Sequence, residues 1–373
     1  MEKRWALQEK ADAQLVEKLS KELNVNHVLA GMMVRRELNS FDLAKSFFRP
    51  SLENLHNPFL MKDMDKAVER IEKAIANQER ILIYGDYDVD GTTSVALTYL
   101  FFKDLHSDIE YYIPDRYVEG YGISTQGIDY AAENQFSLVI ALDCGIKSLD
   151  KIEYANTKNI DFIICDHHLP GNEIPKAIAV LDPKRLDCDY PYKELSGCGL
   201  GFKLIQAYAQ KNNIPLERAL QFLDLVAVSI ASDIVPITGE NRILAYFGLE
   251  KLNQNPCNGL QALKELSGKA DDYTITDVVF SIGPRINAAG RIDDAKKAVK
   301  LLVASSSETA EDAGFIVNLK NAERREFDAS ITEQALTMIL NSPEMEQRKS
   351  TVVYDESWHK GVIGIVASRL TEK

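Results

Sequence analysis

The sequence predicts an α/β protein with a doubly wound, mostly parallel sheet. A helical N-terminal extension precedes this sheet, and a long connecting helix and the start of a second α/β domain follow it. Three observations support this prediction. Short apolar runs alternate with helical segments between residues 81 and 182, as in a sheet covered on both faces. Several of these runs end in aspartate, and 373 residues exceed what one core usually organises.

Residues 1–78 are predicted to form the helical extension. Its clearest segment is Asp63–Asn77, where Met64, Val68 and Ile71 recur at helical spacing. The chain begins with charged residues instead of a signal peptide, and no apolar stretch is long enough to span a bilayer. We therefore expect a cytoplasmic protein with no membrane partner. Five cysteines without a Cys-x-x-Cys pair are typical of reduced thiols in that compartment.

The main α/β domain is predicted over residues 79–305. Its expected strands are Ile81–Tyr84, Ile109–Ile113, Leu138–Leu142, Phe162–Cys165 and Ala177–Leu181. In open α/β sheets, ligands bind beyond the carboxyl ends of the strands. Because Asp86, Asp143, Asp166 and Asp182 follow four of these runs, we expect them to face one crevice.

The remainder of the chain is predicted to be mainly helical from Leu195 onward, most clearly over Ala219–Ser232 and Arg242–Asn253. Residues 306–345 are expected to form a connecting helix, because Glu308–Leu340 contains no proline and only one glycine. Residues 346–373 are expected to begin a second domain, with a strand at Thr351–Tyr354 and a helix at Val362–Leu370. A single strand and helix cannot bury both faces, so we expect the chain to stop within this domain.

Asp86, Asp88 and Asp90 alternate directly after the first predicted strand. On an extended chain, alternating side chains share one face, where three carboxylates repel each other unless a cation lies among them. Oxygen ligands suit Mg²⁺ and Mn²⁺. Gly91 is expected to permit a turn, after which Thr92–Ser94 begin a helix whose free N–H groups can receive a phosphate. An acidic surface turn is the alternative, but it does not explain the buried strand before it.

Three further segments offer ligands. Asp143 ends the third strand, although aspartate there also commonly caps a helix. Asp166, His167 and His168 end the fourth strand; adjacent histidines point in different directions, so one can bind a metal while the other faces a substrate. Imidazole favours Mn²⁺ over Mg²⁺. Asp233 ends an apolar helix, where the helix dipole disfavours an anion unless a cation compensates it.

Arginines supply candidate phosphate contacts. Gly283–Arg291 is predicted to be a glycine-bearing loop in which Arg285 and Arg291 can bind phosphate oxygens bidentately. Asn287 in the same loop and Arg116 in Pro-Asp-Arg-Tyr are further substrate-binding candidates. The alternative interpretation is a loop with two solvated arginines.

Taken in order, these motifs resemble the DHH phosphoesterase family. The motifs are Asp-Tyr-Asp-Val-Asp-Gly at 86–91, Leu-Asp-Cys-Gly at 142–145, Asp-His-His at 166–168 and Ala-Ser-Asp-Ile-Val-Pro at 231–236. Gly-Pro-Arg-Ile-Asn-Ala-Ala-Gly-Arg at 283–291 and the segment at 357–370 are similar to the RecJ-type single-strand-specific exonucleases. The resemblance spans roughly residues 45–373, and the family's later Gly-Gly-His motif and oligonucleotide-binding barrel are not in this sequence.

The resemblance implies a catalytic DHH domain at 79–305, the start of a DHH-associated domain at 346–373, and two metal ions, Mn²⁺ or Mg²⁺. The implied metal ligands are Asp86, Asp88, Asp90, Asp143, His167 and Asp233. Catalytic roles would fall to His168, beside the substrate phosphate, and to Asp143 and Asp88. The implied reaction is 5′-to-3′ hydrolysis of single-stranded DNA to mononucleotides in DNA repair and recombination, with other DNA-repair proteins as partners.

Other functions compete with this one. The net charge of −13 is mild evidence against nucleic-acid binding, although bound cations reverse the field of an acidic site. A haloacid-dehalogenase phosphatase would explain Asp88–Thr92 but not the histidine pair. A small-substrate DHH enzyme, such as a short-oligonucleotide nuclease, cyclic-dinucleotide phosphodiesterase or pyrophosphatase, would share the metal motifs. A non-enzymatic adaptor is disfavoured because every ligand position is intact.

Overall fold

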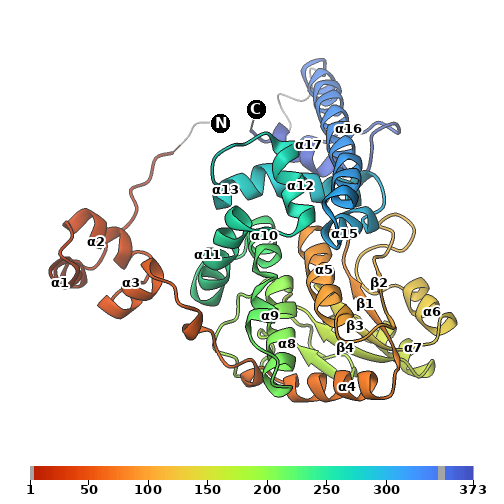
Figure 1. Cartoon of the computed structure of the whole chain (residues 1–373). Helices are drawn as coiled ribbons and strands as arrows, with labels where there is room; N and C mark the ends of the chain where they lie inside the picture. Colours follow the sequence, from red (N-terminus) through yellow and green to blue (C-terminus); the bar gives the residue numbers. More distant parts are fainter. Residues whose placement is uncertain (1–3, 343–348, 373) are drawn as a thin grey trace.

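The protein is built around one five-stranded sheet, seen in a computed structural model that describes residues 4–342 and 349–372 (Figure 1). The strands are β1 (Arg80–Gly85), β2 (Ile109–Tyr112), β3 (Phe136–Leu142), β4 (Asp161–Cys165) and β5 (Ala179–Leu181). Their order is β2-β1-β3-β4-β5, and each neighbouring pair is parallel. The predicted α/β fold with a parallel sheet is confirmed.

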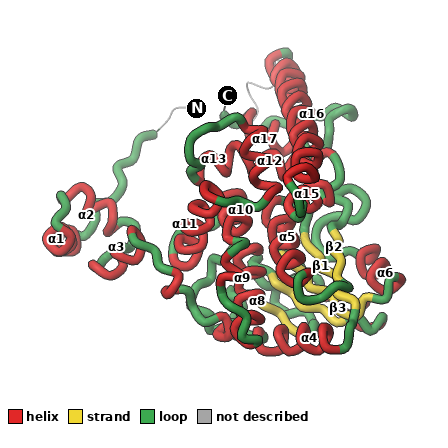
Figure 2. Tube along the Cα trace, in the orientation of Figure 1, coloured by secondary structure: helices red, strands yellow, loops and turns green. Residues whose placement is uncertain are grey.

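Helices cover both faces of the sheet (Figure 2). One face packs on α4 (Met64–Ala76), α5 (Val89–Lys103) and α8 (Gly197–Lys211), and the other on α6 (Thr125–Glu133) and α7 (Leu149–Thr157). Because strand side chains alternate, Ile81 and Ile83 enter the first core, whereas Leu82 and Tyr84 enter the second. Burial on both faces is the physical reason why these strands are continuous apolar runs.

The N-terminal helices form a small separate core, and Figure 1 shows them apart from the main body. They are α1 (Ala13–Leu23), α2 (His27–Val34) and α3 (Phe41–Phe48), followed by short 3₁₀ turns η1 (Leu52–Asn54) and η2 (Pro58–Leu60). The connecting segment is attached to the body through a buried ion pair. Lys203 donates to the His56 carbonyl at 2.7 Å and lies 3.1 Å from Glu240, which also accepts the His56 N–H.

The second half of the described chain is helical, as predicted. It contains α9 (Glu217–Leu220), α10 (Leu223–Asp233), α11 (Gly239–Gln254), α12 (Asn258–Ser267), α13 (Ile275–Asp277), the π-turn η3 (Val278–Ile282), α14 (Gly283–Ile292), α15 (Lys296–Leu302), α16 (Ser307–Leu340) and α17 (Ile363–Leu370). The long helix α16 is continuous, as the absence of proline predicted. It packs against α12, α14, α15 and α17.

Two predicted elements were wrong. Thr351–Tyr354 forms no strand, because no segment of residues 4–342 or 349–372 offers it a hydrogen-bonded edge; Val353 packs instead beside α16 and α17. Gly283–Arg291 is the helix α14 and not a loop. Its glycines are buried and allow neighbouring backbone to approach: a Cβ at Gly290 would overlap the Tyr87 carbonyl oxygen.

The division into 1–78, 79–305, 306–345 and 346–373 stays a proposal, and its last boundary lies within 343–348, outside the described residues. All five cysteines are free thiols, as expected. Within the described ranges, no helix combines the length and apolar character that a membrane crossing needs.

Candidate metal centre

The first aspartates lie in a strand–turn–helix junction, and not on an extended chain as predicted. Helix α5 begins at Val89, three residues earlier than expected, with Asp88 as its N-cap: the Asp88 carboxylate accepts the Gly91 N–H at 3.0 Å. Asp90 therefore occupies the first helical turn. A Cβ at Gly91 would overlap the carbonyl oxygen of Asp86, so glycine permits this close approach instead of a turn.

Asp90 is anchored by two other helices. Its carboxylate accepts the Gly197 N–H at 2.7 Å and the Cys198 N–H at 2.8 Å, both at the start of α8. The Ser229 hydroxyl of α10 donates to it at 2.7 Å. Negative charge is favoured at the N-terminus of a helix. The buried Asp90 side chain is thus held in one orientation before any ligand arrives.

The structure brings all six predicted metal ligands together. Asp86, Asp88 and Asp143 form one group with ligand atoms within 4.8 Å of one another, and Asp90, His167 and Asp233 form a second. Asp143 and His167 also share a third group with His168, so the groups overlap. The Nε2 atom of His167 lies 3.1 Å from Asp143 and 3.6 Å from both Asp90 and Asp233.

The backbone at this centre is unusual. Asp143 follows β3 with φ of 59°, in the left-handed region that few residues other than glycine adopt. Its N–H donates to the Cys165 carbonyl at the end of β4. Asp233 is the last residue of α10, and Ile234 after it also has a positive φ of 59°. Such backbone conformations cluster at functional sites.

Burial and repulsion between like charges disfavour the ionised form of these carboxyl groups. Burial, followed by repulsion from Asp88, raises the pKa of Asp86 to about 7. Burial and Asp90 raise the pKa of Asp233 to about 7, and burial raises the pKa of Asp143 well above its usual range. Burial lowers the pKa of His167, which favours the neutral imidazole that binds metals.

The same residues carry polar atoms without hydrogen bonds. Asp86 Oδ1, Asp143 Oδ1 and both ring nitrogens of His167 are buried and have no hydrogen-bond partner. Although His167 Nε2 lies close to Asp143, the pair does not have hydrogen-bond geometry. Buried polar atoms are rarely left unsatisfied in proteins. Divalent cations would satisfy these atoms and offset the carboxylate repulsion, so the donor set fits Mn²⁺ or Mg²⁺.

His168 lies at the exposed side of the centre, where it forms a group with Asp143 and His167. Its Nδ1 lies 2.7 Å from Asp166 Oδ1, while the other oxygen of Asp166 accepts the Ile146 N–H. The hydrogen bond to Asp166 raises the pKa of His168. The His168 side chain is 45% exposed, and its Nε2 lies 3.3 Å from the Tyr121 hydroxyl. The division in which one histidine binds metal and the other faces substrate stays a prediction.

The residues predicted to contact phosphate lie in different places. Arg116 lies 4.8 Å over the ring of Tyr87, beside the centre. Asn287 and Arg291 line a pocket next to Val89 and Ser232.

Arg285 was predicted to bind phosphate with them, and the structure places it outside that pocket, so its part in substrate binding stays a prediction. It donates to Asn318 Oδ1 at 3.0 Å and to the Ser281 carbonyl at 2.6 Å, and it does not line that pocket. In a helix, residues six positions apart are roughly 240° apart around the axis, so Arg285 and Arg291 face different directions. Sequence reasoning missed Arg324 of α16, which lines the pocket with Arg291. Arg324 could not be found from the sequence, because it lies in the polar middle of a long helix and belongs to no motif.

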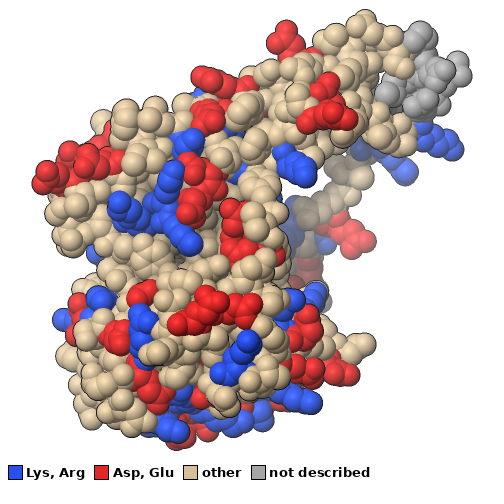
Figure 3. All heavy atoms as spheres, turned by 90° about the vertical axis from the view of Figure 1, so that its right-hand side faces the viewer, with Lys and Arg blue, Asp and Glu red and all other residues tan. Residues whose placement is uncertain are grey.

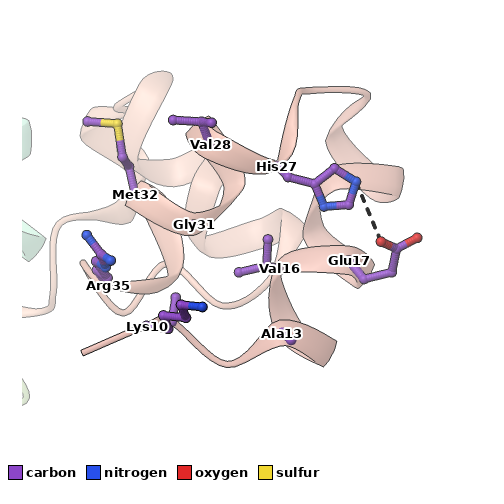
Figure 4. Close-up of a pocket in the computed structure, with 10 residues that line it drawn as sticks. Lys10, Ala13, Val16, Glu17, His27, Val28, Gly31, Met32 and Arg35 are labelled. Carbon is purple, nitrogen blue, oxygen red and sulfur yellow. Dashed lines mark ion pairs between the residues drawn. The ribbon is translucent and has the colours of Figure 1, made fainter. Parts of the chain in front are cut away.

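Within residues 4–342 and 349–372, no group of three or more potential metal ligands lies outside this centre. A pocket of about 460 Å³ between α1 and α2 contains Glu17 and His27, whose side chains are 3.6 Å apart and largely exposed (Figure 4). It lacks the buried carboxylates of the metal centre. Figure 3 shows acidic and basic side chains interspersed over one face, so the charge of −13 is not gathered there into one acidic surface.

Comparison with known proteins identifies related sequences. The model of the DHH family, N-terminal domain, matches residues 80–230. The single-stranded-DNA-specific exonuclease RecJ of Bacillus subtilis is 37% identical over 374 aligned positions, which cover 99% of this chain and 46% of that protein. The Escherichia coli protein of the same name is 34% identical over 84% of this chain and 57% of its own length. The chain therefore spans about half the length of the curated relatives it matches.

Solved structures agree with the sequence comparisons. An exonuclease RecJ bound to manganese is 31% identical, with a TM-score of 0.77 over 86% of this chain and 79% of that one. RecJ from Thermus thermophilus in complex with Mn²⁺ is 28% identical, with a TM-score of 0.83 over 99% of this chain and 52% of that one. A second Thermus thermophilus structure contains Mg²⁺.

Proposed function

The chain belongs to the DHH family, within its RecJ group, and from this premise we propose that it is a metal-dependent exonuclease acting on single-stranded DNA. It hydrolyses phosphodiester bonds from the 5′ end and releases mononucleotides during DNA repair and recombination. The same proposal includes that the protein acts in the cytoplasm together with other DNA-repair proteins. The names of the relatives favour this function over a small-substrate phosphoesterase.

One observation carries the proposal: the six side chains predicted to bind metal come from separate segments and converge at the carboxyl edge of the sheet. Asp143 belongs to two of the overlapping groups, and so does His167. Shared ligands of this kind suit two ions held close together. Their unsatisfied, buried atoms support cation binding independently of the motifs.

Each residue has a proposed role. Two bound divalent cations would supply Lewis-acid stabilisation of the phosphate and a lowered pKa for the attacking water. Asp86, Asp88 and Asp143 would hold one cation, and Asp90, His167 and Asp233 the other. His168, whose Nδ1 is oriented by Asp166, would donate from Nε2 to a phosphate oxygen. The three hydrogen bonds that the Asp90 carboxylate accepts would hold it in one orientation toward the cation.

The test is hydrolysis of a long single-stranded DNA labelled at either end, with Mn²⁺ present. We expect mononucleotides from the 5′ end, little cleavage of a matched duplex, no activity in chelator and recovery when Mn²⁺ is added. Cleavage of a dinucleotide or pyrophosphate without cleavage of long DNA would instead support the small-substrate function. Hydrolysis that persists in strong chelator would contradict the metal mechanism.

A further inference from the structure

The N-terminal helices α1 to α3 carry an apolar surface that their own small core does not cover. Helix α2 has no charged residue over Val28–Val34, so it is apolar on all sides. One side packs in the core, whereas Val28, Leu29 and Met32 remain exposed. Figure 4 shows Val28 and Met32, four residues apart, on the same side of the helix. A helix that is apolar on all sides is normally buried, so this side of α2 is suited to a partner.

The exposed side of α2 borders a groove of about 610 Å³ between α2 and α3. Its lining is apolar apart from Arg36, and its larger side chains include Leu29, Met32, Phe47 and Phe48. Met32 is 46% exposed and Phe48 is 59% exposed. A concave apolar surface of this kind receives the apolar face of an amphipathic helix.

The groove continues toward the main body. A second cavity of about 630 Å³ reaches α11, and Arg36, Leu38 and Phe47 line both cavities. Arg242 of α11 donates to the Phe47 carbonyl at 3.2 Å, and its guanidinium lies 4.7 Å over the Phe47 ring. The two cavities are therefore neighbouring parts of one elongated groove, which suits an extended element such as a helix and not a single side chain.

The charges around the groove favour an acidic partner. Residues 4–50 contain eight Lys and Arg but six Asp and Glu, although the whole chain has a net charge of −13. Lys18 and Lys21 on α1 pair with glutamates of the same helix. In the part of the chain that the structure describes, no carboxylate lies within 4.0 Å of the cations farther along, Arg35, Arg36, Lys45 and Arg49. Unpaired cations beside an apolar groove are complementary to acidic residues of a partner.

We propose that this groove binds an acidic amphipathic helix of a partner protein. Its apolar side chains, spaced at i, i+3, i+4 and i+7, enter between α2 and α3, and its carboxylates face Arg36 and the neighbouring cations. A nucleic acid would instead need aromatic faces on which bases stack, and most of the lining is aliphatic. Figure 1 shows the N-terminal helices apart from the main body. The inference goes beyond the nuclease function and does not depend on it.

Fluorescence anisotropy of a labelled synthetic peptide, titrated with the whole chain, tests the proposal. The peptide is a helix of about 18 residues, or five turns, with Leu at the i, i+3, i+4 and i+7 positions and Glu on the opposite face. One control peptide has the same composition in scrambled order, and a second has Lys in place of Glu. We expect a Kd of about 10 μM or tighter for the acidic peptide, and binding at least about ten-fold weaker for each control.

Three variants locate the binding surface. Arg36→Glu should weaken binding of the acidic peptide by about ten-fold or more and strengthen binding of the Lys peptide, because it reverses the charge beside the groove. Lys18→Glu makes the same charge change on α1, outside the groove, and should change affinity less than about two-fold. Met32→Glu places a charge in the apolar groove and should abolish binding. Since Arg36 is exposed, its variant provides the test if Met32→Glu does not fold.

Three outcomes would overturn the inference. The first is an acidic peptide that binds no better than its scrambled control, or a preference for Glu over Lys that Arg36→Glu does not reverse. The second is a dimer in sedimentation velocity that Met32→Glu abolishes, because a second copy of the chain would then occupy the groove. The third is single-stranded DNA that binds in chelator through Arg36 while the peptide does not. The nuclease assay is independent of all three, so a failure here leaves the proposed function standing.

Discussion

Charged side chains are arranged in opposite ways at the two ends of the sheet. At the amino ends of the strands, opposite charges are paired: Arg70 lies 2.6 Å from both Glu79 and Asp161. Arg80 at the start of β1 lies 2.9 Å from Asp108 and is also paired with β2. Ser137 at the start of β3 donates to Glu79 as well. Each of these charges has a partner within the protein.

At the carboxyl ends, like charges face each other. The ligand atoms of Asp86, Asp88 and Asp143 lie within 4.8 Å of one another, and a buried oxygen atom of Asp86 and one of Asp143 lack hydrogen-bond partners. The charges at the amino edge are thus paired within the protein, whereas the carboxyl edge has unsatisfied groups that suit a bound cation. The ion pairs at the amino edge join strands and helices of the main body to one another. They therefore stabilise the sheet that positions the electrostatically unfavourable carboxylates at the other edge.

Removing one carboxylate from the carboxyl edge should have the largest effect. Asp143→Asn loses a ligand shared by two groups, so we expect activity to fall by about 1,000-fold or more, equivalent to about 4 kcal/mol. The metal-free melting temperature should rise, because one repelling charge is gone. Asp161→Asn is the matched control at the amino edge, with activity expected within about three-fold. Full activity of the Asp143 variant with Mn²⁺ would remove that residue from the centre.

Breaking the amino edge should instead affect stability. Arg70→Ala leaves Glu79 and Asp161 without their cation, and we expect a loss of about 2–3 kcal/mol in urea unfolding. This is less than for a fully buried pair, because both carboxylates are partly exposed. Arg218→Ala, in the exposed pair with Asp104, should cost less than about 1 kcal/mol. A comparable loss in both variants, or a lower kcat per folded Arg70→Ala molecule, would contradict the comparison.

The pH dependence of stability should have opposite signs at the two edges. Without metal, Asp86 and Asp233 have pKa values raised to about 7, so they bind protons more tightly when folded. The free energy of unfolding should therefore fall as pH rises from about 4 to about 7. The pKa of Glu79 is lowered from 4.5 to about 2 by its hydrogen bonds to Ser137 and Arg70, which outweigh the opposing effect of burial. Its stabilisation should be complete above about pH 4.5 and lost toward pH 2.

Urea unfolding between pH 2 and 8 in chelator would measure both trends. Saturating Mn²⁺ should remove the fall between pH 4 and 7, because cation binding favours ionised carboxylates. Asp86→Asn should flatten the fall without metal. A metal-free stability that rises through this range would show that the carboxyl edge is not electrostatically unfavourable.

Much of the metal centre could be predicted because several of its residues directly follow apolar runs that are recognisable as strands. An apolar run that ends in aspartate places Asp86 and Asp143 at the carboxyl edge, whichever order the strands take. The histidine pair was identified in the same way. Asp88 and Asp90 lie in the predicted centre, but they belong to a helix start and not to the extended chain that was predicted.

The sequence by itself determined the α/β class, the parallel strands and the six side chains that converge, because strand periodicity and strand-end position are local properties. Only the tertiary structure decided the direction of Arg285, the contribution of Arg324 and the absence of a strand at Thr351–Tyr354. These outcomes depend on which helix faces pack together and on whether a partner strand is present. Such contacts join residues far apart in the chain, and a local pattern of side chains carries no information about them.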